Sequence, residues 1–148
     1  MTARQQLARL LPLVLLVVLV IAGLRGAVSA PRWDGPLKAD GSMIVGKVGA
    51  ELDLAGGYAA AKQTGLAILA SLRANLGDLN RVRRVVKTLG MVNCASDFQQ
   101  QPQVINGFSE LFAEVFGKDL GVGARSAVGM GSLPGNIAVE VEVILEIE

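Results

Sequence analysis

The residues best suited to chemistry lie near the end of the chain, where an arginine and several glutamates occupy two strand-like segments. Arg125 stands between the small residues Ala124 and Ser126, a context typical of an arginine in a fixed, partly buried position, where its planar guanidinium can bind a carboxylate through two hydrogen bonds. Glutamates alternate with apolar residues in the second segment, beginning at Glu140. From the residues alone, two interpretations stay open. Arg125 forms an internal salt bridge, for example with Glu140 on the adjoining strand, or it binds an anionic ligand.

The composition restricts the chemistry that such a site could use. The chain contains no histidine and a single cysteine, Cys94. Ser-His and Cys-His pairs and an internal disulfide are therefore excluded, and zinc loses its commonest nitrogen ligand. Catalysis would depend on carboxylates, arginine, lysine, hydroxyl groups, backbone groups and water. Cys94 is predicted to be a buried small residue, because no histidine can activate its thiol.

Size and charge predict one domain without a nucleic-acid partner. A chain of 148 residues is long enough for a single hydrophobic core. The net charge is +1 and charged residues make up 18% of the chain, so a broad basic face for a polyanion is not expected. The densest basic cluster, residues 81–87, lies in a valine-rich segment and is interpreted as a solvated strand face or edge.

Residues 1–30 form an apolar N-terminal segment that permits two interpretations. Arg4 and Arg9 precede a long run of Leu, Val and Ile, and small residues follow, as in a signal peptide or membrane anchor. The same run has the composition of a strand that is buried on both faces. The main domain is expected to comprise residues 31–148. A cytoplasmic location is predicted, with export or membrane anchoring through residues 1–30 as the alternative.

Hydrophobic spacing predicts two helices and several strands in the main domain. Apolar side chains recur at intervals of three and four in residues 54–76 and again in residues 104–116, with Gly77 and Gly117 as the expected helix ends. Valine-rich or alternating segments predict the strands, of which the last two are expected to form a closing antiparallel pair. These segments are residues 43–48, residues 81–93, the segment that contains Arg125, and residues 139–148. The order indicates an α+β sandwich with helices on one face of a sheet.

A glycine-rich loop, residues 129–135, joins the last two predicted strands. It lacks the Lys-Ser/Thr ending of a phosphate-binding loop and leads into a strand rather than into a helix N-terminus. We therefore interpret the loop as a turn between strands.

Four segments carry a recognisable pattern. The most specific is ARSAVGMGSLPGNIAVEVE (residues 124–142), which combines an A-R-S motif, a short apolar strand, a leucine-proline turn and a strand of V-E-x-E type. The others are QVINGFSELF (103–112), GDLNRV (77–82) and GGYAAA (56–61). Together they resemble the RidA family, also called YjgF or endoribonuclease L-PSP. The resemblance covers about residues 41–148 and is greatest to the longer branch of the family, which has extra residues before its second helix, as QQQPQ is here.

The resemblance implies an α+β fold, the chorismate-mutase-like sandwich, in which two helices cover one face of a mixed sheet. It also implies a homotrimer with three clefts between subunits. Family members that are enzymes hydrolyse reactive 2-imino acids and their enamine tautomers to 2-keto acids and ammonia, without a cofactor or a metal. The expected partner is therefore a 2-imino acid or another small carboxylate.

Carried over by position, the resemblance implies roles for four residues. Arg125 would bind the substrate carboxylate, and Glu140 would orient or activate the attacking water. Asn106 matches a family position near the cleft. Ala127 stands where several members have a cysteine, so its backbone groups are expected to contact the ligand while a thiol role is excluded. The absence of histidine agrees with this chemistry, because an imine is already electrophilic and needs a positioned water.

The chain departs from the family pattern near its N-terminus. Family members have an early strand that ends in a V-S-G-Q or V-S-G-H segment lining the cleft, and the nearest match here is AVSAP (residues 27–31). Two other functions therefore stay open. One is a trimer that binds or senses a small carboxylate without turnover. The other is ribonuclease activity, which the family's older name suggests and the absence of histidine and of a basic groove disfavours.

Overall fold

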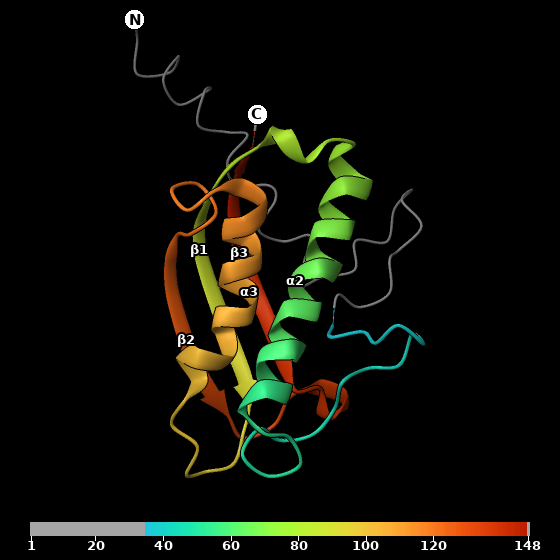
Figure 1. The fold of residues 1–148 in the computed structure, drawn as a ribbon, viewed down its shortest axis with the longest axis vertical. Coiled ribbons are helices and arrows are strands. Elements are labelled where there is room, and N and C mark those ends of the chain that lie inside the picture. Colours follow the sequence, from blue (N-terminus) through green and yellow to red (C-terminus); the bar gives the residue numbers. More distant parts are fainter. Residues whose placement is uncertain (1–34, 148) are drawn as a thin grey trace, which may run out of the picture.

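Two long helices lie side by side over one face of a three-stranded sheet in the computed structural model, which describes residues 35–147 (Figure 1). Along the chain the elements are α2 (Leu54–Leu76), η2 (Leu79–Arg81), β1 (Val82–Asn93), α3 (Gln101–Phe116), β2 (Ala124–Met130), η3 (Pro134–Asn136) and β3 (Val139–Ile147). This confirms the expected α+β architecture. The segment of residues 1–30 and the AVSAP match lie outside the described residues.

The ends of both helices follow the signals in the sequence. Asp53 caps α2 by accepting a hydrogen bond of 2.7 Å from the backbone N–H of Gly56. Gly77 ends the helix with a φ of 79°, a backbone conformation that glycine adopts at little cost. Pro102 lies in the first turn of α3, and Gly117 ends it. The predicted helix positions are therefore confirmed.

The sheet has the order β2-β1-β3, with β2 parallel and β3 antiparallel to the central strand β1. The expected closing antiparallel pair is wrong, because β1 separates the last two strands. Their connection is not a tight turn: it contains η3 and passes beyond the end of β1. There the Asn93 side-chain nitrogen donates to Asn136 Oδ1 at 2.9 Å and to the carbonyl of Ile137 at 3.2 Å. These bonds hold the connection in the position from which β3 begins.

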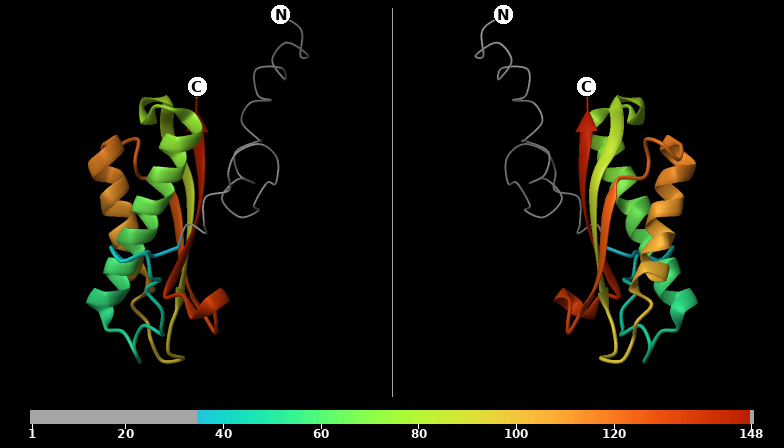
Figure 2. Two further views of the ribbon diagram at one scale, coloured as in Figure 1. Left: turned by 90° about the vertical axis from the view of Figure 1, so that its right-hand side faces the viewer. Right: turned by 90° about the vertical axis from the view of Figure 1, so that its left-hand side faces the viewer.

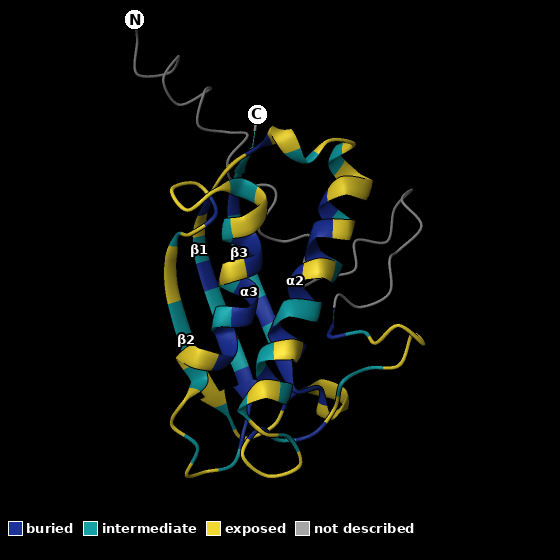
Figure 3. Cartoon of the chain, in the orientation of Figure 1, coloured by how far each residue is buried: buried dark blue, intermediate teal, exposed yellow. Residues whose placement is uncertain are grey.

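The two faces of the sheet differ in what covers them. Alternate residues of β3 are buried beneath the helices, namely Val139, Val141, Val143 and Leu145 (Figure 3). The other face carries half-buried side chains, among them Leu89, Met91, Glu140, Glu142 and Ile144. Among residues 35–147 no α-helix or strand covers this second face (Figure 2). We call it the outer face of the sheet. The period of two in the sequence predicts this division, and the structure confirms it.

The helices approach each other closely because small residues lie between them. A Cβ added to Gly107 of α3 would be 2.2 Å from the backbone oxygen of Tyr58 on α2. Next to this contact, the rings of Phe108 and Phe112 stack in the core with centroids 4.1 Å apart. The position of α3 relative to α2 and to the sheet is thus fixed by backbone contact as well as by side-chain packing.

Two smaller expectations have different outcomes. Residues 43–48 do not form a continuous strand and instead make isolated bridges, in which Val45 pairs with Ile137 and Val48 pairs with Leu52 and Cys94. In the basic cluster of residues 81–87, Arg83 and Arg84 are exposed as predicted, although β1 is the central strand. The described part of the chain contains no helix with the length and hydropathy to span a bilayer.

Candidate functional site

Arg125 lies on β2, at one edge of the sheet, and is held by two side chains of α3. Its register partner on β1 is the buried Thr88, so the side chain projects toward the helices. Arg125 Nη1 donates to Asn106 Oδ1 at 2.8 Å and to Ser109 Oγ at 3.1 Å. Asn106 and Ser109 are three positions apart and therefore share one face of α3. The structure thus brings together two of the predicted site residues, Arg125 and Asn106, and adds Ser109.

No carboxylate of residues 35–147 forms an ion pair with Arg125. The internal salt bridge to Glu140 is therefore wrong. The interpretation required β2 and β3 to be neighbours, whereas β1 lies between them. The guanidinium is instead exposed and bonded to neutral acceptors, so its charge remains available to an anion.

Glu140 lies on the opposite side of the sheet from Arg125. It alternates with the buried Val139 and Val141 and pairs in register with Met91, so its carboxylate is on the outer face. Its side chain is half-buried and has no hydrogen-bond or ion-pair partner within residues 35–147. Within one chain, Arg125 and Glu140 cannot contact the same small ligand.

Ala127 occupies the position two residues beyond Arg125 and lies on the same side of β2. Its register partner is Gly90, and its half-buried side chain packs against the core. A methyl group there offers no chemistry. A ligand could contact this position through backbone groups alone.

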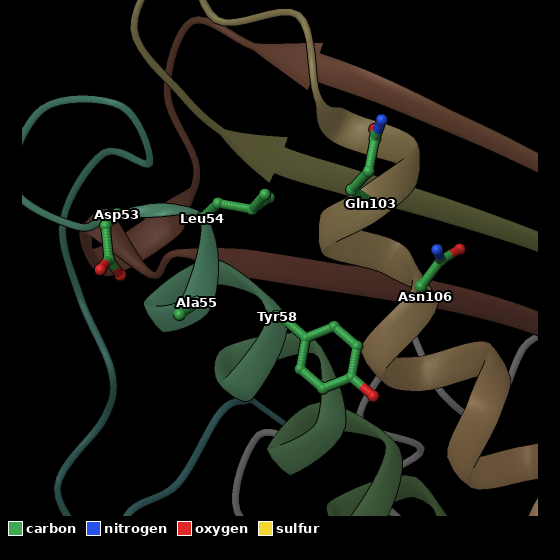
Figure 4. Close-up of a pocket in the computed structure, with 6 residues that line it drawn as sticks. All are labelled: Asp53, Leu54, Ala55, Tyr58, Gln103 and Asn106. Atoms are coloured by element: carbon green, nitrogen blue, oxygen red, sulfur yellow. The ribbon is translucent and has the colours of Figure 1, made fainter.

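A shallow hollow of about 570 Å³ lies beside the Arg125 contacts, between the first turns of α2 and α3 (Figure 4). Its walls are Asp53, Leu54, Ala55, Tyr58, Gln103 and Asn106. Asn106 belongs both to this wall and to the pair that holds Arg125, so the hollow and the guanidinium are neighbours. The hollow could not be predicted from the sequence, because its walls come from the first turns of two helices that are far apart along the chain.

Tyr58 bridges the helices at one side of the hollow. Its hydroxyl donates to Glu110 Oε2 at 2.6 Å. This hydrogen bond to a carboxylate raises the pKa of Tyr58, and partial desolvation and the negative charges of Glu110 and Glu114 raise it further. The bond connects α2 to α3 at this side of the hollow.

The remaining reactive groups do not form a second site. Cys94 is buried, as predicted, and its sulfur lies 3.7 Å from Nε2 of Gln101. Within residues 35–147 no three Cys, Asp or Glu side chains lie close enough to hold a metal ion. The Arg125 cluster is therefore the best candidate in the described part of the chain.

Comparisons with known proteins agree with this architecture. The model of the family described as "YjgF/chorismate mutase-like, putative endoribonuclease" matches residues 30–146. Protein TCP17 of Trypanosoma cruzi is 43% identical over 107 residues, which cover 72% of this chain and 67% of that protein. A solved protein of unknown function from Agrobacterium tumefaciens is also 43% identical, with a TM-score of 0.73 over 77% of this chain and 74% of that one. A "putative endoribonuclease" from Shewanella oneidensis is 25% identical, with a TM-score of 0.71 over 76% and 74% of the two chains.

Proposed function

Because the chain belongs to the YjgF/chorismate mutase-like family, we propose that it hydrolyses 2-imino acids and their enamine tautomers to 2-keto acids and ammonia. The observation that carries this proposal is the setting of Arg125. An exposed guanidinium is oriented by Asn106 and Ser109, and within residues 35–147 no carboxylate neutralises it. Such a group suits a small ligand that carries one carboxylate.

The reaction needs little beyond positioning. Water adds to the imine carbon, and its proton passes through a carboxylate to the imine nitrogen. The carbon–nitrogen bond of the resulting carbinolamine then breaks as the hydroxyl proton passes through the same carboxylate to the departing nitrogen, which leaves a keto group and ammonia. In this proposal Arg125 binds the substrate carboxylate and Glu140 accepts and returns the proton. Backbone groups at Ala127 complete the contacts.

The proposal requires a second copy of the chain. Since the sheet separates Arg125 from Glu140 in one protomer, a shared cleft has to bring Arg125 of one chain to the partner subunit's Glu140. A homotrimer with clefts between subunits meets this requirement. The half-buried outer face supports it, because Leu89, Met91 and Ile144 place apolar surface around Glu140 and Glu142.

The direct test compares Arg125→Ala with the wild type on an imine generated in place by an amino-acid oxidase, with ammonia release as the readout. We expect kcat/KM to fall by about a hundredfold, because a charged, bidentate contact is lost. Arg73→Ala is the matched control, since Arg73 is an exposed arginine in the last turn of α2, off both β2 and the outer face, and its activity is expected to stay at the wild-type value. Equal loss in both variants, or an inactive wild-type trimer, contradicts the proposal.

A binding or sensing role is the second candidate, and the separation of Arg125 from Glu140 favours it. A protein of this kind would retain a carboxylate on Arg125 without turning it over. Calorimetric binding of a 2-keto acid by a wild type that releases no ammonia would support this role. RNA cleavage that survives Arg125→Ala would instead direct attention to the nuclease activity named for the Shewanella oneidensis protein.

A further inference from the structure

We propose that Ser109 is a positioning residue for Arg125, and that it determines which edge of the guanidinium meets the ligand. The inference rests on the proposed function, in which Arg125 binds the substrate carboxylate. Ser109 lies on α3 at half-buried depth, and its hydroxyl oxygen is 3.1 Å from Arg125 Nη1.

The two acceptors on α3 match the two hydrogens on Nη1. Asn106 Oδ1 lies 2.8 Å from this nitrogen and Ser109 Oγ lies 3.1 Å from it, so each acceptor takes one N–H. A single acceptor would leave the guanidinium free to turn about that bond. Two acceptors three residues apart on α3 fix the orientation of the guanidinium plane.

The acceptors themselves are on a rigid element. Gly107, between them, lies against the backbone of Tyr58, and the neighbouring Phe108 is buried in the core. The backbone at Asn106 and Ser109 therefore cannot shift without displacing α3 from α2. Their positions relative to β2 are those of the folded domain, so Arg125 is oriented before a ligand arrives.

The orientation has a chemical consequence. With Nη1 occupied, the guanidinium retains the N–H of Nε and the two of Nη2, and the Nε hydrogen and one Nη2 hydrogen point in the same direction along one edge. This edge matches the two oxygens of one carboxylate. Because Asn106 accepts through Oδ1, its Nδ2 group remains a donor beside the hollow. The ligand that fits is a planar monocarboxylate with a hydrogen-bond acceptor next to the carboxylate, as in a 2-keto or 2-imino acid.

The test removes and restores the Ser109 hydroxyl. Ser109→Ala is expected to weaken pyruvate binding to the assembled protein about fivefold, measured by calorimetry, and to raise KM more than it lowers kcat. Ser109→Thr keeps the hydroxyl and is expected to restore wild-type affinity. Ser132→Ala, which removes an exposed hydroxyl from the loop after β2, is the matched control and should change nothing. Equal affinities in the wild type and Ser109→Ala overturn the positioning role.

A second measurement separates this inference from the function on which it rests. In isotope-labelled protein, the Nη1 hydrogens of Arg125 are expected to exchange with solvent more slowly in the wild type than in Ser109→Ala. The nuclear magnetic resonance signal of Arg125 is assigned as the one that is missing from the spectrum of Arg125→Ala. Alanine favours the helix, so the fold of Ser109→Ala should persist. A wild type that does not bind pyruvate overturns the function of Arg125. Exchange at the same rate in the wild type and in Ser109→Ala overturns the positioning role, whether or not the wild type binds pyruvate.

Discussion

Arg125 can bind an anion because its hydrogen-bond partners are neutral. Asn106 and Ser109 fix the guanidinium without cancelling its charge, whereas a carboxylate at the same distance would neutralise it. The nearby Tyr58 shows the opposite arrangement, in which a neutral hydroxyl is bonded to the carboxylate of Glu110. Single side chains thus set both the charge and the donors around the hollow.

Tyr58 provides a test of this local electrostatics, because it is the only tyrosine in the chain. We expect its ultraviolet titration to have a midpoint above the ordinary pKa of 10.0, since ionisation would break the bond to Glu110 and place two negative charges together. Because the pKa is raised in the folded state, the stabilising bond is fully present below pH 10.0 and is lost as pH rises through the folded value. The folded protein is to be compared with the protein in denaturant.

Two variants assign the cause of this shift. Glu110→Gln is expected to lower the Tyr58 midpoint markedly, because it removes the hydrogen-bonded carboxylate. Glu114→Gln is the matched control and should lower it less, since Glu114 acts only through its charge. Equal midpoints in Glu110→Gln and in the wild type would contradict the assignment.

Part of this site could be predicted from the sequence. Arg125 and Asn106 were predicted through a family resemblance, and the structure places them in contact. Ser109 was missed, although a polar residue three positions after Asn106 on a helix is a signal that could have been used. The internal pairing with Glu140 was wrong because the choice between neighbouring strands depends on contacts between distant segments, which local residue types do not encode.

At the scale of elements, the contact between α2 and α3 positions the site. Helix ends and periodicity are local properties, so the bounds of both helices followed from spacing and capping residues. The order of the strands is a long-range property. The last two strands had the spacing of a hairpin, yet Asn93 holds their connection at Asn136 and Ile137, and β1 lies between them.

Gly107 is the residue at which the contact between α2 and α3 is most sensitive to an added side chain. In Gly107→Ala the new Cβ would lie 2.2 Å from the backbone oxygen of Tyr58, so the helices must separate. We expect the free energy of unfolding to fall by about 3 kcal/mol, measured with urea. Gly131→Ala is the control, because nothing lies within 4 Å of its added Cβ and it should change stability little. A Gly107→Ala protein as stable as the Gly131→Ala protein would show that the helices adjust freely.

At the scale of the whole molecule, the outer face of the sheet decides how a complete cleft can form. One chain displays Arg125 on the helix side and Glu140 on the outer side, so neither side alone has both groups. Assembly through the outer face would bury Leu89, Met91 and Ile144 and would bring carboxylates toward a neighbouring chain. Neither the sequence nor one protomer specifies the number of copies, and the homotrimer stays a prediction.

Met91→Glu tests the assembly. The substitution places a second carboxylate beside Glu140 on the outer face, where desolvation and like charge both oppose association. We expect the trimer mass, measured by light scattering, to fall to that of the monomer while the circular dichroism spectrum is retained. Leu66→Glu adds the same charge at an exposed leucine of α2 and should leave the mass unchanged. A trimer that persists in Met91→Glu would exclude the outer face as the interface.

The strand order also bears on how the chain is made. Both partners of the central strand β1 are synthesised after it, so its two edges stay unpaired until residues 124–147 have emerged. A valine-rich strand with open edges is prone to pair with other nascent chains. Arg83, Arg84 and Lys87 interrupt that strand, and charges at such positions oppose self-association. The basic cluster that has no evident part in ligand binding would therefore protect the protein from aggregation during its synthesis.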